Sequence, residues 1–463
     1  MARDVRAALD PLMAPASPLR VAVLGAGTVG GAVVRVFLDR PELLVTHDGA
    51  PVELVAVAVR DVERARLASI PVALLTDAPA HLVADDGVDV VVELMGGDEP
   101  AHTLVAAALG AGKAVVTANK HMLAHHGAAL EATARRSGAA LRFEASVGGG
   151  IPLLSPIAED LAANRVSGLR GIVNGTTNFI LNDMASRGRD YGEVLADAQA
   201  AGYAEADPTA DVEGFDAANK LVILMRLAFG FWADPADIAR TPLSLAGRPR
   251  AGITGVGSDE LAGAAALGLA IKLIASATRL EDGTIFASVL PTALPLTDPM
   301  SRVEGVTNRI EVRAEPIGSL AFSGPGAGGP ATASAVLGDL MALARRAGST
   351  WAGLPPAVAP PAIAGPIYES PDRGWYAFAP GVRREVAADE RVRTAIASGG
   401  TAIHARCLSL AELRALLSPL MPDELEAPIY TTDESPAVPT GGELRPGEVA
   451  GGPAGRSPAA GPR

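Results

Sequence analysis

A run of carboxylates that ends in one lysine is the part of the sequence best suited to acid and base chemistry. Residues 202–220 read GYAEADPTADVEGFDAANK, which places Asp216 and Lys220 on one face of any helix that begins near Gly214. On an exposed helix this would be a surface ion pair that contributes roughly a few tenths of a kcal/mol. Residues 221–229 are apolar around most of the helix, however, and predict a buried helix. A lysine at its edge can donate a proton near neutral pH, because burial lowers its pKa while nearby carboxylates raise it.

A glycine-rich turn near the N-terminus has the pattern of a dinucleotide-binding loop. Residues 25–30 read GAGTVG and lie between a strand predicted over 20–24 and a helix predicted over 29–38. The first glycine allows the tight turn, the second lets the backbone approach the pyrophosphate, and the third lets helix and strand pack closely. The pattern alone could be a turn without a ligand, but its position between strand and helix favours a cofactor site. The residues predicted to bind the cofactor are Gly25, Gly27, Thr28, Val29 and Gly30.

The residue that ends the second predicted strand bears on the choice of coenzyme. NAD-selective folds often place an acidic residue there to bind the ribose hydroxyls, whereas this strand, over 52–59, ends in Arg60. An arginine at this position suits the 2′-phosphate of NADP. Asp61 follows directly and could still reach the ribose, so the sequence favours NADP only slightly over NAD.

Short apolar strands alternate with helices in the N-terminal part of the chain. Further strands are predicted over 88–94 and 114–117, with a helix between them. Repeated βα units predict an α/β fold with a Rossmann-type, doubly wound parallel sheet. Residues 151–321 lose this alternation and carry polar loops, a long apolar helix near 221–231 and a strand over 284–289. They predict an inserted α+β domain for the substrate.

These patterns divide the chain into six parts. A polar lead-in covers 1–18, the dinucleotide-binding domain 19–150 and the substrate domain 151–321, and a segment of about 322–350, with a helix over 337–346, completes the first domain. Proline and alanine dominate 351–366 and predict a linker. Residues 367–430, with a helix near 410–417, give no clear fold type. Residues 431–463 carry almost no large apolar side chain and predict a disordered tail.

Composition and charge restrict the function classes. Of the 463 residues, 49% are hydrophobic and 20% charged, as in folded globular proteins. The formal net charge of −13 argues against a nucleic-acid partner, because such proteins carry a basic face. Cys407 is the only cysteine, so neither an intramolecular disulfide nor a multi-thiolate metal site can form, and a reducing cytoplasm is expected. No apolar stretch has the pattern of a signal peptide or membrane span, which predicts no membrane partner.

Several motifs, in the right order, identify the sequence as a member of the homoserine dehydrogenase family. Residues 202–220 resemble the family signature G-Y-A-E-A-D-P-T-A-D-V-E-G-x-D-A-x-x-K, which is long and specific. Its other motifs resemble TANK over 117–120, EASVGGGIP over 144–152, NGTTN over 174–178, and GPGAG over 324–328 followed by Thr332. The resemblance covers residues 19 to about 348. It implies NAD(P)-dependent interconversion of L-homoserine and L-aspartate 4-semialdehyde, in threonine, methionine and isoleucine biosynthesis.

The resemblance also implies roles for individual residues. The catalytic residues would be Lys220, as the preferred proton donor, Lys120 and Asp216. The substrate would be surrounded by Tyr203, Glu205, Asp211, Gly175 and Thr176, and the coenzyme would also contact Lys120 and Gly328. A monovalent cation, usually sodium, would lie between the carbonyls of Val147, Gly149 and Ile151 and the acidic Glu144, although GGG over 148–150 alone would more often be a flexible turn. Members of the family are homodimers built through the substrate domain.

Other interpretations remain open from the residues alone. The phosphorylating dehydrogenase of aspartate semialdehyde uses a cysteine nucleophile, and Cys407 lies outside any site-like context. A catalytically idle dinucleotide sensor would keep the glycine loop but lose the acidic residues and the lysine. His121, His125 and His126 could suggest a metal site, but they have no carboxylate or cysteine cluster and predict an exposed helical face. After Pro355 we find no β-rich aromatic opening of the ACT domain that senses threonine in many members, so threonine feedback stays open.

Overall fold

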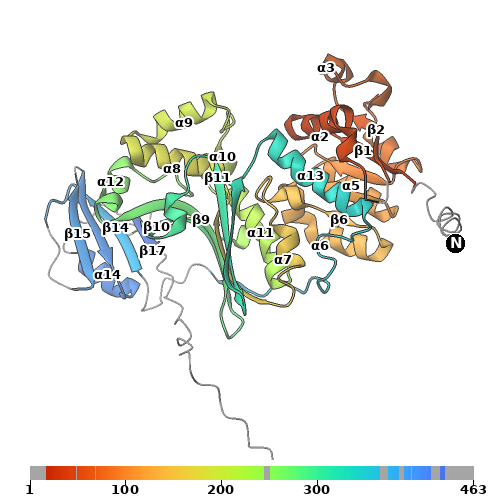
Figure 1. Cartoon of the computed structure of the whole chain (residues 1–463). Coiled ribbons are helices and arrows are strands. Elements are labelled where there is room, and N and C mark those ends of the chain that lie inside the picture. Colours follow the sequence, from red (N-terminus) through yellow and green to blue (C-terminus); the bar gives the residue numbers. More distant parts are fainter. Residues whose placement is uncertain are drawn as a thin grey trace, which may run out of the picture.

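The computed structural model describes residues 17–47, 50–67, 69–244, 251–364, 374–384, 390–397, 399–418 and 428–432. The chain forms two lobes (Figure 1). The N-terminal elements, from red to orange, make one lobe, and the long green and blue strands belong to the other. The cyan helix α13 (Gly329–Ala344) lies with the N-terminal elements, so the chain returns to the first lobe late in the sequence.

The first lobe is built on six short strands, of which four contain several valines. They are β1 (Leu19–Leu24), β2 (Val52–Ala58), β3 (Leu75–Thr76), β4 (Val90–Glu93), β5 (Ala114–Thr117) and β6 (Leu141–Arg142). The order is β3-β2-β1-β4-β5-β6, and each neighbouring pair is parallel. Val23 and Val91 are fully buried, as expected for strands covered on both faces. The predicted doubly wound parallel sheet is confirmed, and its ligand crevice lies where the order reverses, between β1 and β4.

Helices cover both faces of this sheet. Besides α13 they are α2 (Thr28–Asp39), α3 (Val62–Leu67), α4 (Pro79–Ala84), α5 (Ala101–Gly110) and α6 (Lys120–Ser137), with 3-10 turns at Pro41–Leu43, Val72–Leu74 and Glu144–Ser146. α5 and α6 contribute to one apolar cluster and α2 and α13 to another. The segment that completes this lobe begins with α13 at Gly329, later than the boundary near residue 322 that we predicted, because the preceding strand runs to Pro325.

The second lobe contains a mixed sheet of eleven strands. Its main path has the order β12-β11-β7-β9-β10-β17-β14-β16-β15. β8 (Leu243–Ser244) lies off this path and pairs with β17. One end of the path consists of β12 (Gly318–Pro325), β11 (Thr307–Glu315), β7 (Arg165–Ile172), β9 (Leu269–Arg279) and β10 (Ile285–Pro295). They form antiparallel pairs with one another.

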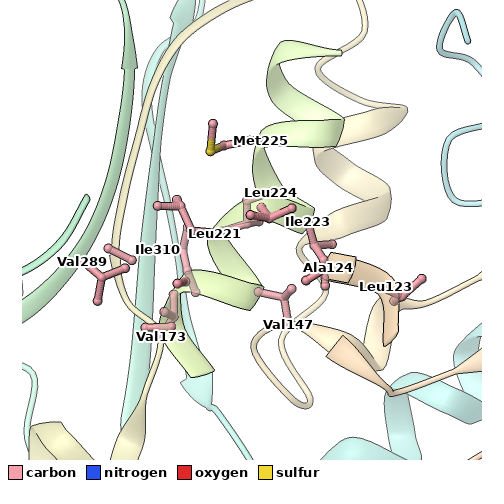
Figure 2. Packing of buried hydrophobic residues seen from close by; sticks show 14 of the residues in the cluster. Leu123, Ala124, Val147, Val173, Leu221, Ile223, Leu224, Met225, Val289 and Ile310 are labelled. Carbon is pink, nitrogen blue, oxygen red and sulfur yellow. The ribbon is translucent and has the colours of Figure 1, made fainter. Parts of the chain in front are cut away.

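The helices of this lobe carry most of the candidate site residues. They are α7 (Leu154–Ala158), α8 (Gly175–Arg187), α9 (Tyr191–Ala200), α10 (Thr209–Val212), α11 (Phe215–Phe229) and α12 (Ser258–Ala266), with 3-10 turns at Pro235–Asp237 and Pro299–Arg302. α11 is the predicted apolar helix, and all but two of its residues are buried. Figure 2 shows Leu221 of α11 in the same apolar cluster as Val289 of β10 and Ile310 of β11. The helix thus fills the space between the second sheet and the first lobe.

The C-terminal region extends the second sheet. It consists of β14 (Gly374–Pro380), β15 (Val392–Ala397), β16 (Gly400–Ala405) and β17 (Pro428–Thr432), in the order β17-β14-β16-β15 with each neighbouring pair antiparallel. α14 (Leu410–Leu417) covers one face through Leu413 and Leu417. α12 lies on the opposite face, where Gly263 approaches Tyr376 and Phe378. The described residues of the region for which we predicted no fold type therefore form strands that continue the second sheet, and they share α12 with the substrate domain.

Two expectations for the C-terminal half need correction. Thr431 and Thr432, which we expected in a disordered tail, lie in β17 and pair with β10 and β14; residues 433–463 lie outside the described residues. The described part of the predicted linker, residues 351–364, packs against the rest of the protein, because Trp351 is buried and β13 (Ile363–Ala364) pairs with β10. Both predictions were wrong because these residues contact others that are distant in sequence. Within the described ranges, no helix is long and apolar enough to cross a membrane.

Candidate active site

Two of the chain's four lysines meet at one carboxylate where the lobes join. Asp216 Oδ2 accepts a hydrogen bond from Lys220 Nζ at 2.7 Å, and Asp216 Oδ1 lies 3.0 Å from Lys120 Nζ. Lys120 is the first residue of α6 in the first lobe, whereas Asp216 and Lys220 lie one turn apart in the first half of α11. The predicted buried pair is therefore present, and it is joined by a second lysine from the other lobe.

The charges of this cluster determine how its members ionise. Burial would raise the pKa of Asp216, but the ammonium groups of Lys220 and Lys120 outweigh it and hold that pKa well below its usual range. The Asp216 carboxylate in turn raises the pKa of Lys120, against the effect of burial, with smaller contributions from Asp211 and Glu205. Burial and the Asp216 charge raise the pKa of Asp211. Asp216 is therefore ionised and Lys120 protonated at neutral pH.

Lys220 is the more tightly held of the two lysines. Its ammonium also donates to the Val173 carbonyl at 2.7 Å, and its side chain is only 10% exposed, compared with 43% for Lys120. An ammonium group has three protons, so two fixed bonds leave one for a substrate oxygen. The two hydrogen bonds of Lys220 can therefore direct the third proton of its ammonium group toward a substrate.

Two asparagines complete the cluster, and we did not single out either of them from the sequence. Asn174 Nδ2 donates to Asp211 Oδ1 at 2.7 Å and to Asp216 Oδ2 at 2.9 Å, so it holds the two carboxylates together. Asn308 Nδ2 donates to the Val173 carbonyl that also accepts from Lys220. The NGTTN motif contains Asn174 and could have indicated it; Asn308 lies in a strand with no local signal.

The predicted substrate residues lie beside this cluster on α8 and the loop before α10. Asn174 caps α8, and Gly175 and Thr176 form its first turn. Thr176 Oγ1 donates to the Tyr203 carbonyl at 2.6 Å, which ties the loop to the helix. Tyr203 is 45% exposed and Glu205 is also exposed, so both side chains are accessible to a small polar ligand.

The glycine loop has the geometry that dinucleotide binding requires. Gly25 has a φ of +99°, and an added Cβ there would lie 2.8 Å from the Leu94 carbonyl oxygen. A Cβ on Gly30 would lie 1.9 Å from the Gly25 carbonyl oxygen, whereas one on Gly27 would meet nothing within 4 Å. Gly27 caps α2, which Thr28 and Val29 begin. The open space beside Gly27 is where a pyrophosphate can approach the helix N-terminus.

The remaining predicted coenzyme residues border the same edge of the sheet. Arg60 is exposed just beyond β2. Gly328 caps α13 with a φ of +111°, and a Cβ on the next residue, Gly329, would lie 2.9 Å from the Thr28 carbonyl oxygen. The N-termini of α2 and α13 therefore lie close together beside the crevice.

The loop 147–151 has the donor set of a hard-cation site. Val147, Gly149 and Ile151 are buried, and no described residue donates a hydrogen bond to their carbonyls. Oxygen ligands of this kind fit a monovalent cation. The Glu144 carboxylate, however, accepts hydrogen bonds from the amides of Leu153, Leu154 and Ser155 and from the Ser155 hydroxyl. That carboxylate caps α7 and supports the loop.

The histidines of α6 do not form a metal site in the described part of the chain. His126 Nε2 lies 2.7 Å from Asp98 Oδ1 and its ring stacks on His102, while the His121 ring lies 4.2 Å from that of His125. They line a surface of α5 and α6, in accord with the predicted exposed helical face.

The chain is similar to homoserine dehydrogenases in each comparison. The family model for homoserine dehydrogenase matches residues 152–341, and that for the homoserine dehydrogenase NAD-binding domain matches residues 25–144. The Mycobacterium tuberculosis homoserine dehydrogenase is 46% identical over 332 residues, 71% of this chain and 73% of that protein. The Corynebacterium glutamicum enzyme is 42% identical over 360 residues, 75% and 78% of the two chains.

Solved structures give the same result for the fold. A homoserine dehydrogenase from Thiobacillus denitrificans covers 90% of this chain and 97% of its own, with a TM-score of 0.77 and 32% identity. A hyperthermophilic archaeal homoserine dehydrogenase in complex with NADPH covers 72% of this chain and 98% of its own, with a TM-score of 0.58 and 25% identity.

Replacing Asp216 with asparagine should lower the pKa of Lys120. Burial of the lysine would remain, whereas the carboxylate that raises its pKa would be gone. The side-chain ammonium signals of a chain with four lysines can be followed by 15N NMR over a pH series. Asp207→Asn is the matched control, since Asp207 is an exposed carboxylate of the same loop that bonds to Thr209. An unchanged Lys120 pKa in Asp216→Asn would contradict the shared-carboxylate arrangement.

Proposed function

The chain belongs to the homoserine dehydrogenase family, and on that premise we propose how its residues perform the reaction. The enzyme interconverts L-homoserine and L-aspartate 4-semialdehyde by NAD(P)-dependent hydride transfer, a step in threonine, methionine and isoleucine biosynthesis. The observation that carries our proposal is a buried carboxylate, that of Asp216, which lies between Lys120 and Lys220 at the junction of the lobes.

Lys220 is the proton donor and acceptor in this proposal. When bound, the nicotinamide supplies a hydride to the aldehyde carbon of the semialdehyde or takes one from the alcohol carbon of homoserine. In reduction the carbonyl oxygen gains negative charge, and the Lys220 ammonium gives it a proton to form the hydroxyl. In oxidation the neutral Lys220 amine takes that proton back. The two bonds of Lys220 to Asp216 and Val173 fix its direction, which favours the transition state over the ground state.

Lys120 supplies a second positive charge, and the residues around it bind the amino acid. The raised pKa of Lys120 keeps it charged beside the developing oxyanion and the coenzyme. Glu205 and Asp211 offer carboxylates to the substrate amino group. Tyr203 and the first turn of α8, with Gly175 and Thr176, border the rest of the substrate; the hydrogen bond from Thr176 to Tyr203 supports this assignment.

Coenzyme and cation complete the proposed site. NADP is slightly favoured over NAD, because Arg60 at the end of β2 can pair with a 2′-phosphate. A sodium ion fits the carbonyls of Val147, Gly149 and Ile151, which have no donor among the described residues. Glu144 contributes to that site through the loop it supports rather than through a free carboxylate oxygen.

We also propose a homodimer that forms on the open face of the second sheet. Ala277 and its partner Ala287 point toward the buried cluster around α11, whereas Ser276 and its partner Ser288 lie on the other face and stay half-exposed. Phe286 is also half-exposed on that face. A flat patch of small side chains around an aromatic ring suits contact with a second copy of the same sheet.

Lys220→Ala should reduce kcat for NADP⁺-dependent oxidation of L-homoserine by about a thousandfold while the protein remains folded, because general acid–base catalysis contributes on the order of 10²–10⁴. Initial rates of coenzyme reduction with NADP⁺ and with NAD⁺ test this and the coenzyme preference together. Lys113→Ala is the control, since Lys113 lies just before β5 and, among the described residues, donates to the carbonyls of Asp85 and Val88. Near-parent turnover in folded Lys220→Ala would refute the role of Lys220.

Ser288→Arg should convert the dimer into a monomer, since a charged, long side chain would separate the two apposed sheets. Light scattering during size-exclusion chromatography gives the molar mass of the parent and of the variant. A monomeric parent, or a variant that keeps the dimer mass, would refute this interface.

A further inference from the structure

A second buried ion pair joins the two helices that carry the catalytic cluster. Lys120 and Glu131 belong to α6, and Asp216 and Arg226 belong to α11. Glu131 accepts hydrogen bonds from Arg226 Nε at 2.7 Å and from Arg226 Nη2 at 2.6 Å. The two side chains are 2% and 0% exposed. This pair takes no part in the mechanism proposed above.

The spacing of the two ion pairs shows how the helices are aligned. Glu131 is eleven residues beyond Lys120, and Arg226 is ten residues beyond Asp216. At 1.5 Å per residue, each step corresponds to about 15–17 Å along its helix. α6 and α11 therefore run side by side in the same direction, with one ion pair at the catalytic end and the other about three turns away. Figure 2 shows Ala124 of α6 and Ile223 of α11 in the apolar layer between them.

Glu131 is the centre of a larger set of hydrogen bonds. Besides Arg226, its carboxylate accepts from Trp232 Nε1 at 2.8 Å, Arg135 Nε at 2.9 Å and the Ala357 amide at 3.3 Å. Packing is tight at this level, since a Cβ on Gly127 would lie 2.6 Å from the Trp232 ring. The set joins α6 to α11 and to the segment that follows the first lobe.

Such a pair contributes more to the specific alignment of the two helices than to the stability of the fold. Replacing both members of a buried ion pair with apolar residues of similar volume is often neutral or stabilising, whereas removing one member strands a buried charge. Apolar contacts would allow α6 to slide or rotate on α11 by a fraction of a turn. Two charged, forked hydrogen bonds allow only one position. A shift of one residue along a helix is 1.5 Å, and a misplacement of about 1 Å can cost roughly a hundredfold in rate.

We propose that Glu131 and Arg226 are positioning residues, whose buried pair fixes the register of α6 on α11 and so sets the distance between Lys120 Nζ and Asp216 Oδ1. This inference rests on the proposed roles of Lys120 and Asp216. It makes a prediction that separates positioning from folding, because a matched apolar pair can restore stability without restoring the register.

The double variant Glu131→Met/Arg226→Met should remain folded, at a somewhat lower unfolding temperature than the parent because Trp232 Nε1 loses its acceptor, and should lose about ten- to a hundredfold in kcat. KM for L-homoserine should change by less than about threefold, because no substrate residue is altered. The alkaline limb of the kcat profile should move to lower pH, because Lys120 loses the support of a displaced Asp216. A purely structural pair would leave this limb in place.

Controls make each outcome decisive. Arg20→Met/Asp89→Asn removes an ion pair at the amino ends of β1 and β4, away from the crevice, and should leave kcat and its pH profile unchanged. If the Met/Met variant does not fold, Glu131→Gln, which keeps the side-chain length and one acceptor oxygen but loses the charge that pairs with Arg226, should show the same shifted limb. Parent-like kcat and pH profile in whichever variant folds would overturn the positioning role. A parent without homoserine-dependent activity would instead overturn the proposed function.

Discussion

The candidate site depends on one ionised carboxylate that is buried between two ammonium groups. Removing such charges from water costs several kcal/mol each, and only close pairing with further hydrogen bonds offsets that cost. Asp216 meets this condition through Lys120, Lys220 and Asn174. Because Lys120 comes from the first lobe and the other three from the second, the charge balance is complete only when the lobes are joined. The same ion pairs that prepare the site for catalysis therefore also fix how the two lobes are joined.

Glycines at the junction of the lobes let two backbone segments approach each other closely. A Cβ on Gly149 would lie 2.6 Å from the carbonyl carbon of Gly326, and one on Gly326 would lie 2.1 Å from Asn308. Glycine at these positions lets loop 147–151 and the return to α13 contact each other directly. The same close approach keeps Asn308 beside the Val173 carbonyl, which in turn holds Lys220. Gly149 and Gly326 therefore help to position Lys220.

Local patterns predict the elements of this fold better than their long-range contacts. The strand over 114–117 was predicted with its observed bounds, and most of the apolar helix predicted near 221–231 lies in α11, which starts earlier, at Phe215. The motif residues indicated the site for the same reason, since each motif is continuous. Asn308, the Glu131–Arg226 pair and the pairing of Thr431 with β10 join residues far apart in sequence. Local sequence could not predict that Glu144 caps α7 either, because this depends on how the loop between them folds back.

A double-mutant cycle can measure whether Lys120 shares the charge of Asp216, to which Lys220 is also bonded. Lys120→Met, Asp216→Asn and the double variant would be compared with the parent by kcat/KM for L-homoserine oxidation at constant pH. If the carboxylate is shared, Lys120→Met should cost much less in the Asp216→Asn background than alone, with a coupling energy on the order of 1–3 kcal/mol. If the losses in kcat/KM of the two single variants simply multiply in the double variant, the two side chains act independently and Lys120 does not share the carboxylate of Asp216.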